Sequence, residues 1–412
     1  MRISKDIVTL SIVGLGGRAN AYLNALEEYY SGKYRLVAVA EPDLEKQKMV
    51  KDKYNIPTEN IFADDIEFMK KDRLSDVVMI TTQDKLHFRE FAGLLAKGYD
   101  IILEKPIATT IEEVIKMKEL ASKYPNQLIA VCHVLRHSPL FTKIKEIIDT
   151  NELGKIITIQ HNENIGYYHY VHSYVRGPWR NSEESSPLIL AKSCHDLDIL
   201  LYLTNSHAKK IASFGTLTEF KKENFDEEKM ADYCIDCKVE KECPFSALKI
   251  YSSQKIKSVV FDLSSVDKIR KYLGASQYGR CVYRCDNNVV DHQSTIIEFD
   301  GGITATFNIS AFTSKINRTI KIMCQYGEIR ACEKPYLIEV TNFKTEQTKQ
   351  YEIETTATGH GGSDKKFIIN FMEAYLNNGK FNSTLLSAVE SHIMAFLAEK
   401  SRINGGKVEE IK

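Results

Sequence analysis

Residues 8–19 read VTLSIVGLGGRA, and this stretch decides the fold. The run from Val8 to Val13 is short, apolar and rich in β-branched residues, as in a buried strand, and a glycine-rich loop of the form G-x-G-x-x-A follows it. The residues after the loop, AYLNALEEYY, carry a helical pattern. A strand, a glycine loop and a helix in this order predict the start of a dinucleotide-binding α/β domain.

The residues of the loop have separate expected roles. Gly14 permits a tight turn, Gly16 lets the backbone approach a pyrophosphate at the helix N-terminus, and Ala19 keeps the helix close to the sheet. Glu41 ends the next strand, where an acid bonds the adenosine ribose, and its charge repels a 2′-phosphate. NAD is therefore the favoured cofactor, while Arg18 and Lys46 keep NADP open. The expected cofactor contacts are Gly14, Gly16, Gly17, Arg18, Ala19 and Glu41.

The sequence up to residue 135 alternates short strand-like runs with amphipathic stretches, which is typical of a parallel sheet built from strand-helix-strand units. Thr110 and Glu113 form a capping-box start for a helix that ends near Ser122. The predicted strands are Val8 to Val13, Leu36 to Ala40, Val77 to Thr81, Ile101 to Leu103 and Leu128 to Val131.

The pattern changes after residue 150 to long alternating runs. HQSTIIEFDGGITATFNIS, with a turn at Asp300 and Gly301, and IKIMCQYGEIRACEKPYLIEV predict antiparallel hairpins, and Leu385 to Ile403 predicts a final helix. The expected fold class is an α/β Rossmann domain over residues 1–135, followed by an α+β domain over residues 136–412 with a large, mostly antiparallel open sheet. A cysteine-containing insertion lies at about residues 220–290.

Composition narrows the classes of function. The 412 residues are 43% hydrophobic, and Lys plus Arg equal Asp plus Glu at 55 each, so no net charge attracts nucleic acid or an anionic membrane. No apolar stretch is long enough to predict a membrane span, and the N-terminal run is too short for a signal peptide. Nine cysteines, an odd number, favour reduced thiols or metal ligation over a disulfide framework. We therefore expect a cytoplasmic protein that binds a small molecule.

A candidate catalytic lysine follows the fifth predicted strand. Glu104-Lys105-Pro106 lies at the carboxyl edge of the sheet, where open α/β sheets bind their ligands. Beside a nicotinamide, Lys105 could hydrogen-bond a hydroxyl group and help to remove its proton, provided that burial lowers its pKa. A solvent-exposed salt bridge is the alternative for a lysine seen in isolation.

These segments together resemble the Gfo/Idh/MocA oxidoreductase family. The resemblance rests on VGLGGRA, VAVAEPDLEK, TTQDKLHFREFAGLLAKGYDIILEKPIATT and HVLRHSPLFTKIKEIIDTNELGKI. It implies a Rossmann domain, an open-sheet substrate domain and NAD(P)-dependent oxidation of sugars or inositols. It also implies that Lys105 is the catalytic lysine, that Glu104 lies near the nicotinamide, and that Thr82 and His87 line the cofactor side. The chain departs from the family at Thr81-Thr82-Gln83-Asp84, where a Thr-Pro pair is common.

The segment from Ser186 to Leu203 supplies the second set of catalytic candidates. It spaces Lys192, His195 and Asp198 three residues apart, which places them on one face of a helix. His195 is similar to the family's active-site histidine. The family often has an Asp one turn before that histidine, where this chain has Ala191, so Lys192 is a candidate to replace it. Packing or capping is the alternative role for both residues.

Aromatic and basic residues upstream form a candidate sugar-binding wall. Aromatic rings pack against the C–H face of a sugar, and Arg or His bonds its hydroxyls. An oligomer interface is an equal alternative for this loop. The glycine-rich loop before residue 364 could add a histidine, or simply be a flexible entry to a helix. The candidates for substrate binding are His172, Tyr174, Arg176, Trp179, Arg180 and His360.

The cysteine pattern points to a metal. Cys234-x2-Cys237-x5-Cys243, with Cys281 and Cys285 further along, suits a closed tetrahedral zinc site. Cys281 is preferred over Cys285 as the fourth ligand. An iron-sulfur cluster and free thiols are the alternatives.

Three functions follow from these features. The first is an NAD-dependent dehydrogenase acting on a hydroxyl of a sugar, polyol or sugar derivative. The second is a glycosidase or lyase that uses bound NAD for transient oxidation and elimination. The third is a sensor without enzymatic activity that binds NAD and a sugar. An exposed open sheet favours a homodimer or homotetramer.

Overall fold

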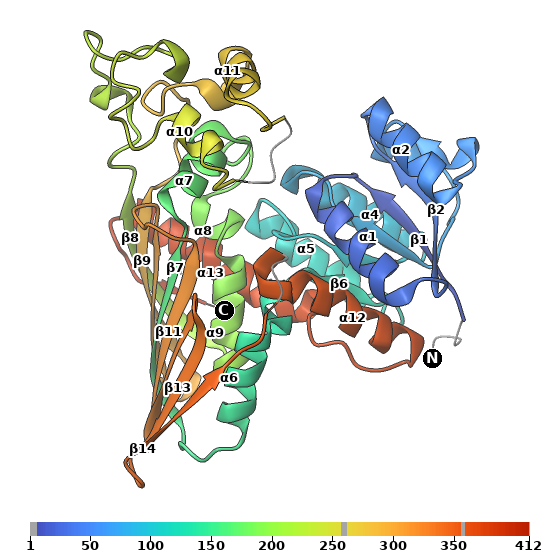
Figure 1. Cartoon of the computed structure of the whole chain (residues 1–412). Helices are drawn as coiled ribbons and strands as arrows, with labels where there is room; N and C mark the ends of the chain where they lie inside the picture. Colours follow the sequence, from blue (N-terminus) through green and yellow to red (C-terminus); the bar gives the residue numbers. More distant parts are fainter. Residues whose placement is uncertain (1–5, 257–261, 356–358, 412) are drawn as a thin grey trace. The chain divides into compact units, whose positions relative to one another are not determined.

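The structure is a computed structural model, and it describes residues 6–256, 262–355 and 359–411 (Figure 1). The chain forms two compact units made of interleaved segments. The first unit comprises Met1–Glu152, Cys194–His207 and Glu352–Phe396, and the second comprises Leu153–Ser193, Ala208–Tyr351 and Leu397–Lys412. The boundary predicted after residue 135 therefore differs from this division, because two later segments return to the first unit.

A six-stranded sheet forms the centre of the first unit, in the order β3-β2-β1-β4-β5-β6. All its pairings are parallel, as the alternation of strands and helices predicted. The two-residue strand β3 was not predicted, because a run this short has no periodicity. The strands are β1 (Val8–Val13), β2 (Tyr34–Ala40), β3 (Ile61–Phe62), β4 (Val77–Ile80), β5 (Asp100–Leu103) and β6 (Ile129–Val131).

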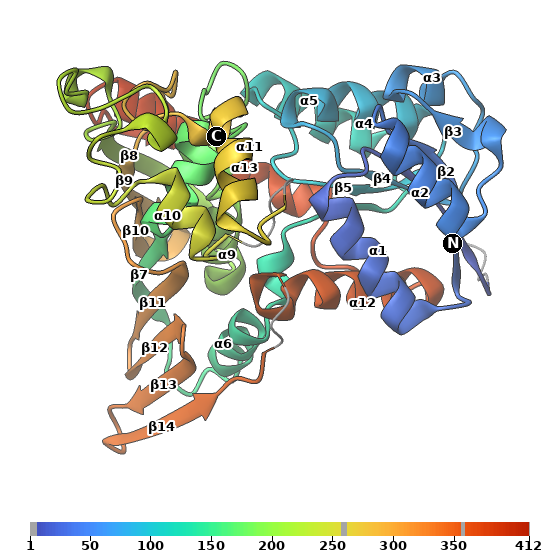
Figure 2. The ribbon, with the colours of Figure 1, turned by 45° about the horizontal axis from the view of Figure 1, so that its top comes forward.

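Helices cover both faces of this sheet (Figure 2). One layer contains α1 (Gly17–Tyr30) and α12 (Ser363–Leu376), which bury Tyr22 and Phe367. The other contains α4 (His87–Ala96) and α5 (Ile111–Ser122), joined by the start of α13 (Leu385–Ile403). The remaining helices of the unit are α2 (Leu44–Tyr54), α3 (Asp65–Met69), α6 (Pro139–Asp149) and α9 (Cys194–Thr204).

The start of α5 and the bounds of α13 agree with the sequence analysis. The Thr110 hydroxyl accepts a hydrogen bond from the Glu113 N–H at 3.2 Å, and the Glu113 carboxylate accepts one from the Thr109 N–H at 3.3 Å. Helix α13 begins and ends at the predicted residues. Phe367, Phe371 and Leu385 are almost completely buried, and burial of each such side chain contributes roughly 1.5–3 kcal/mol. This burial explains why residues 352–396 belong to the first unit.

The second unit is built on a nine-stranded sheet in the order β14-β13-β12-β11-β7-β10-β9-β8-β15. The predicted hairpin at Asp300 forms between β9 and β10, and Gly301 adopts a φ of 75° in its turn. Strands β7 and β10 pair in parallel, whereas β10 with β9, β9 with β8, β8 with β15, β7 with β11, β11 with β12 and β12 with β13 pair antiparallel. The strands are β7 (Ile156–Asn164), β8 (Ala208–Thr216), β9 (His292–Phe299), β10 (Thr304–Ser310), β11 (Asn317–Cys324), β12 (Gly327–Glu333), β13 (Tyr336–Asn342), β14 (Gln347–Glu352) and β15 (Glu409–Glu410).

The cysteine-containing insertion lies between β8 and β9. Within it are α10 (Ala247–Ser252) and α11 (Val266–Ala275). Two other short helices of the second unit, α7 (Tyr167–Tyr170) and α8 (Leu188–Ala191), come before it in the chain. Among the described residues, no helix is both long enough and apolar enough to cross a membrane.

Candidate active site

The glycine loop connects β1 to α1 and has the geometry that a pyrophosphate needs. Gly14 has a φ of +88°, and a Cβ there would lie 2.9 Å from the carbonyl oxygen of Thr81, so no other residue fits without strain. Nothing lies within 4 Å of a Cβ added at Gly16 or Gly17. No side chain caps α1, and its first N–H groups can therefore donate to an anion.

Glu41 lies against this loop. Its side chain is buried, and its carboxylate accepts hydrogen bonds from the N–H of Leu15 at 2.7 Å and of Asp43 at 3.1 Å. The ammonium group of Lys46 is 3.7 Å from the same carboxylate. The structure thus places the acid beside the glycine loop, where a ribose acceptor is expected.

Arg18 connects the glycine loop to the lysine loop. Its Nε donates to Glu104 at 2.7 Å, and its terminal nitrogens donate to Asp364 at 2.9 and 3.0 Å and also to the Tyr22 hydroxyl. Burial alone would raise the pKa of Glu104, but the Arg18 guanidinium holds this pKa below its usual value. Arg18 is therefore held by carboxylates of its own unit.

Lys105 lies on the loop after β5, as predicted. The Glu104 carboxylate accepts a hydrogen bond from the Lys105 N–H at 3.0 Å, and the Lys105-Pro106 peptide bond is cis. His87 bridges this loop to the one after β4, with Nδ1 2.7 Å from the Pro106 carbonyl and Nε2 3.2 Å from the Thr82 carbonyl. Thr82, His87, Glu104 and Lys105 thus meet at the carboxyl edge of the sheet.

Thr82 also contacts a buried acid. Its hydroxyl donates to Glu90 at 2.5 Å, and burial raises the pKa of Glu90 to about 7. This contact holds the loop in which the chain departs from the family's Thr-Pro pair.

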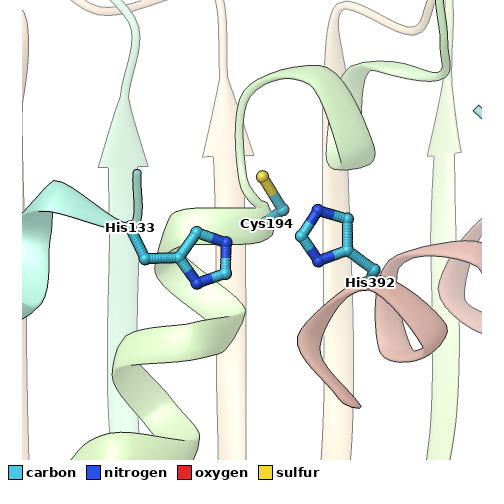
Figure 3. Close-up of side chains that lie close together, drawn as sticks. All are labelled: His133, Cys194 and His392. Carbon is cyan, nitrogen blue, oxygen red and sulfur yellow. The ribbon is translucent and has the colours of Figure 1, made fainter. Parts of the chain in front are cut away.

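Three buried side chains, two histidines and one cysteine, lie close together (Figure 3). His133 follows β6, Cys194 begins α9, and His392 belongs to α13; their ligand atoms lie within 4.8 Å of one another. The His133 and His392 rings stack with centroids 5.4 Å apart, and the His195 ring is 5.8 Å from that of His133. Lys105 interacts electrostatically with both Cys194 and His392, so α9 brings His195 into the neighbourhood of Lys105.

The ring of His392 has no nitrogen left for a metal. Its Nδ1 is 2.8 Å from the Ala388 carbonyl, and its Nε2 accepts a hydrogen bond from the Ile107 N–H at 3.0 Å. Burial raises the pKa of the Cys194 thiol to about 12, so this group is neutral. We therefore interpret the group as a packed support beneath the lysine loop.

Asp198 orients this support. Arg136 donates two hydrogen bonds to its carboxylate, at 2.6 and 2.7 Å, and His133 Nδ1 lies 2.9 Å away. Burial alone would raise the pKa of Asp198, but Arg136 and His133 hold it well below its usual value. The sequence pattern did not identify His133, Arg136 or His392 as site residues. For His133, the signal was its position directly after a predicted strand.

Acid should destabilise the first unit through His392. Burial lowers the pKa of His392 to about 3, with His133 as the next cause, whereas the unfolded ring titrates near 6.5. Between these values the unfolded chain binds more protons, so stability falls as the pH falls, by about 2 kcal/mol at pH 5. Urea unfolding of the His392→Gln variant should show a flatter pH dependence than the parent. An equally flat profile for the control His207→Gln, whose ring is exposed, would contradict this assignment.

Lys192 does not lie on one helix with His195, although the sequence predicted that it would. The segment forms two helices, α8 and α9, with a turn at Lys192 and Ser193 between them, so Lys192 does not share a helical face with His195. Its ammonium group lies 3.2 Å from the fully buried Glu163, which also binds Arg318 at 2.7 Å. All three residues belong to the second unit.

The predicted sugar-binding wall is partly built into the second unit. Tyr174 is buried against Tyr170, and His172 Nδ1 is 2.8 Å from the Tyr251 hydroxyl. Trp179 is half-buried beside Tyr174, while Arg180 binds Asp286 at 2.8 and 2.9 Å.

The two remaining candidates are Arg176 and His360. Arg176 is only 1% exposed and points among the cysteines of the insertion, which removes it from a substrate surface. The side chain of His360 lies outside the described residues.

Comparison with known proteins matches the whole architecture. The model of the oxidoreductase family with an NAD-binding Rossmann fold, Gfo/Idh/MocA, matches residues 8–133, and the model of its C-terminal alpha/beta domain matches residues 145–409. A putative oxidoreductase YteT of Bacillus subtilis is 23% identical over 85% of each chain. An inositol 2-dehydrogenase of Salmonella typhimurium is 24% identical over 48% of this chain and 55% of its own.

Solved structures share the fold. An inositol dehydrogenase homolog of Azotobacter vinelandii complexed with NAD+ superposes with a TM-score of 0.69 at 13% identity, over 100% of this chain and 99% of its own. The WlbA dehydrogenase of Bordetella pertussis, in complex with NADH and UDP-GlcNAcA, has a TM-score of 0.67 at 12% identity over 99% of each chain.

Proposed function

Because the chain belongs to the Gfo/Idh/MocA family of oxidoreductases, we propose that it oxidises a hydroxyl group of a sugar, polyol or sugar derivative with NAD. The observation that carries this proposal is the meeting of the glycine loop, the Lys105 loop and the start of α9 within one unit. The glycine loop, Lys105 and His195 therefore belong to one packed body.

Bound NAD supplies a hydride acceptor for the carbon that carries the reacting hydroxyl. Lys105 accepts the hydrogen bond of this hydroxyl and takes its proton as the hydride leaves, so the products are a carbonyl group and a protonated lysine. His195 contacts the same hydroxyl and orients it. Glu104 and His87 fix the backbone on either side of Lys105. Lys192, held by Glu163, is a candidate to position the substrate.

The cofactor contacts follow from the loop geometry. Gly14, Gly16, Gly17 and Ala19 shape the pyrophosphate site, and Glu41 bonds the ribose. Thr82 and His87 line the nicotinamide side. For the second unit we propose that His172, Tyr174, Trp179 and Arg180, with His360 from its glycine-rich loop, bind the substrate.

A substrate panel tests the activity. The purified chain is incubated with NAD and with inositols, free sugars or sugar acids, while NADH absorbance is followed, and aryl glycosides are tested in parallel for aglycone release. Net NADH with a polyol or sugar supports the dehydrogenase. Aglycone release without net NADH would instead support redox-neutral elimination, and NAD binding without either signal would support a sensor.

Replacing Glu41 should weaken the preference for NAD over NADP. In Glu41→Ala, the ribose loses a charged hydrogen-bond partner worth about 1.5–3 kcal/mol, and the repulsion of a 2′-phosphate disappears. We expect the ratio of NAD to NADP affinity to fall roughly 10- to 100-fold. Fluorescence titration with both dinucleotides measures this ratio. Glu45→Ala, an exposed acid four residues away, should leave it unchanged, and an unchanged ratio in Glu41→Ala would exclude the ribose contact.

We also propose that the chain is a homodimer or homotetramer that assembles through one face of the nine-stranded sheet. Directly paired residues share a face, and Ile296, Thr306, Gln160, Lys321 and Arg330 follow one another across five strands. Ile296 is 58% exposed, and a hollow of about 560 Å³ lies on this face. Light scattering should give a mass that is a multiple of the 47.0 kDa chain mass. The measured mass should be lower for Ile296→Lys.

Two finer properties complete the proposal. All nine cysteines are free thiols, which supports a cytoplasmic location in a reducing compartment. We further propose a structural zinc ion in the cysteine insertion, as the spacing of its cysteines predicts. Elemental analysis of the purified chain, with about one zinc per chain expected, tests this metal.

A further inference from the structure

Among the described residues of the second unit, the most enclosed cation lies among the cysteines. Arg176 is 1% exposed and ends the helical turn that follows α7. Its Nε donates to the Arg280 carbonyl at 2.7 Å, one terminal nitrogen donates to the Phe245 carbonyl at 2.9 Å, and the same nitrogen lies 3.5 Å from Cys234 Sγ. Its other terminal nitrogen has no hydrogen-bond partner among the described residues.

Arg176 has no carboxylate partner among the described residues. Every other arginine that is at least nine-tenths buried pairs with an acid, as Arg136 does with Asp198 and Arg318 does with Glu163 and Glu333. A guanidinium does not release its proton in a protein, and an unpaired buried charge is costly. The groups that interact electrostatically with Arg176 include the thiols of Cys234, Cys243, Cys281 and Cys285 and the phenol of Tyr251.

Four of the five cysteines surround one hollow. A cavity of about 380 Å³ is lined by Cys234, Cys237, Cys243 and Cys281, and also by Arg176. An isolated β-bridge between Tyr233 and Arg280, with a hydrogen bond from the Cys281 N–H to the Asp232 carbonyl at 2.7 Å, joins the two cysteine-bearing segments. The Ala247 N–H points at Cys234 Sγ from 3.5 Å.

The fifth cysteine is separated from this hollow. Cys285 is not among the lining residues, and its thiol donates to the Cys281 carbonyl at 3.3 Å. The thiols of Cys234 and Cys237 also donate to backbone carbonyls, at 3.9 and 4.0 Å, so it is the absence of Cys285 from the cavity lining, and not its hydrogen bond, that argues against it as a ligand. This difference distinguishes Cys281 from Cys285.

We propose that Cys234, Cys237, Cys243 and Cys281 bind one zinc ion as thiolates, and that Arg176 is the buried counter-cation of this group. This inference rests on the proposed zinc ion and is independent of the dehydrogenase activity. Four thiolates outweigh the charge of one zinc ion, so the group is an anion and supplies the negative charge that Arg176 lacks. The four thiol protons pass to solvent as the metal binds.

The sulfurs are held round the cavity and must move inward to bind. Within the described part of the chain, the one set of three metal-binding side-chain atoms found within 4.8 Å of one another is that of His133, Cys194 and His392. Zinc requires sulfur at about 2.3 Å. Binding should therefore contract the cavity and tie the two segments of the insertion together.

Cobalt substitution distinguishes the ligands. The full chain, purified under reducing conditions and stripped with a chelator, is titrated with Co²⁺, whose tetrahedral thiolate complex absorbs visible light. The parent and Cys285→Ser should both give this spectrum at one equivalent, while Cys281→Ser should not. Loss of the spectrum in Cys285→Ser and its retention in Cys281→Ser would overturn the choice of ligand. Circular dichroism checks that each variant is folded. If a variant is unfolded, a second measurement replaces its titration: the alkylation of Cys234, Cys237 and Cys243 is measured by mass spectrometry with and without Zn²⁺.

Arg176→Met tests the counter-cation. Removing a partner that supports metal ligands lowers metal affinity roughly 10- to 100-fold, and we expect this loss in competition with a chromophoric chelator. Arg180→Met, which removes an exposed pair with Asp286, is the matched control and should keep the parent affinity. Parent affinity in Arg176→Met would overturn the role of Arg176 while leaving zinc in place. Absence of zinc and of Co²⁺ uptake in the parent would overturn the zinc proposal itself, and a brown iron-containing chain would replace it with an iron-sulfur cluster.

Discussion

Lys105→Met should lose NAD reduction while keeping NAD binding. General acid-base catalysis by a positioned side chain contributes about 10²- to 10⁴-fold, and we expect kcat to fall in this range. In the proposed function the pyrophosphate and ribose contacts come from the glycine loop and Glu41, so we expect the dissociation constant of NAD to change by less than about threefold. Steady-state rates with the best substrate of the panel, together with a fluorescence titration of NAD, measure the two effects separately.

Two further variants separate the proton acceptor from the positive charge. Lys105→Arg keeps the charge but cannot give up a proton, so it should be as inactive as Lys105→Met. Lys118→Met, an exposed lysine of α5, should behave like the parent. An active Lys105→Met would remove the lysine from the chemistry, and an active Lys105→Arg would reduce its role to electrostatics.

The sequence predicted the parallel sheet of the first unit well because the signals for its strands are local. The strands β1, β2, β4, β5 and β6 each combine a β-branched run with a turn, and the G-x-G-x-x-A loop has its strand before it and its helix after it. A two-residue strand such as β3 has no period to detect. The same reasoning located Lys105, because its position depends only on where a parallel strand ends.

Several residues in and around the site contact partners that are far away in the sequence, and residue spacing does not predict such contacts. His133 and His392 stack although almost the whole of the second unit lies between them in the chain. Arg18 was expected at a phosphate, but its guanidinium binds Glu104 and Asp364. Arg176 was grouped with a sugar-binding loop by its neighbours in sequence, and the fold places it among cysteines. Each of these partners comes from a distant segment.

The turn between α8 and α9 shows how a local rule can fail. Residues three apart share a face only if one helix continues through them, and the break at Lys192 and Ser193 separates Lys192 from His195. The apolar run around this break gave no proline or glycine to mark it. Lys192 is instead positioned by Glu163, a residue of β7.

Asp198→Asn should cause the largest loss of stability among these variants. The Arg136 guanidinium is buried and would lose its charged partner, which costs about 3–5 kcal/mol in buried pairs. The lowered pKa of Asp198 keeps the carboxylate charged at neutral pH. The contribution of Asp198 to stability is therefore fully present above its pKa in the unfolded chain, near 3.9. It is lost as the pH falls through the lower pKa of the folded state. Urea unfolding at pH 7 measures the difference from the parent.

Two further variants test whether burial, and not the ion pair alone, produces this effect. Asp149→Asn removes an exposed i,i+4 partner of Lys145 on α6 and should cost less than about 0.5 kcal/mol. The double variant Arg136→Met/Asp198→Leu removes both charges, so it should recover much of the loss seen in Asp198→Asn. If the double variant were less stable than the single one, the hydrogen bonds to His133 and the backbone would outweigh the unpaired charge. In that case Asp198 would act chiefly by orienting His133. The main effect of Asp198→Asn would then be a lower kcat, and its loss in the free energy of unfolding would be small.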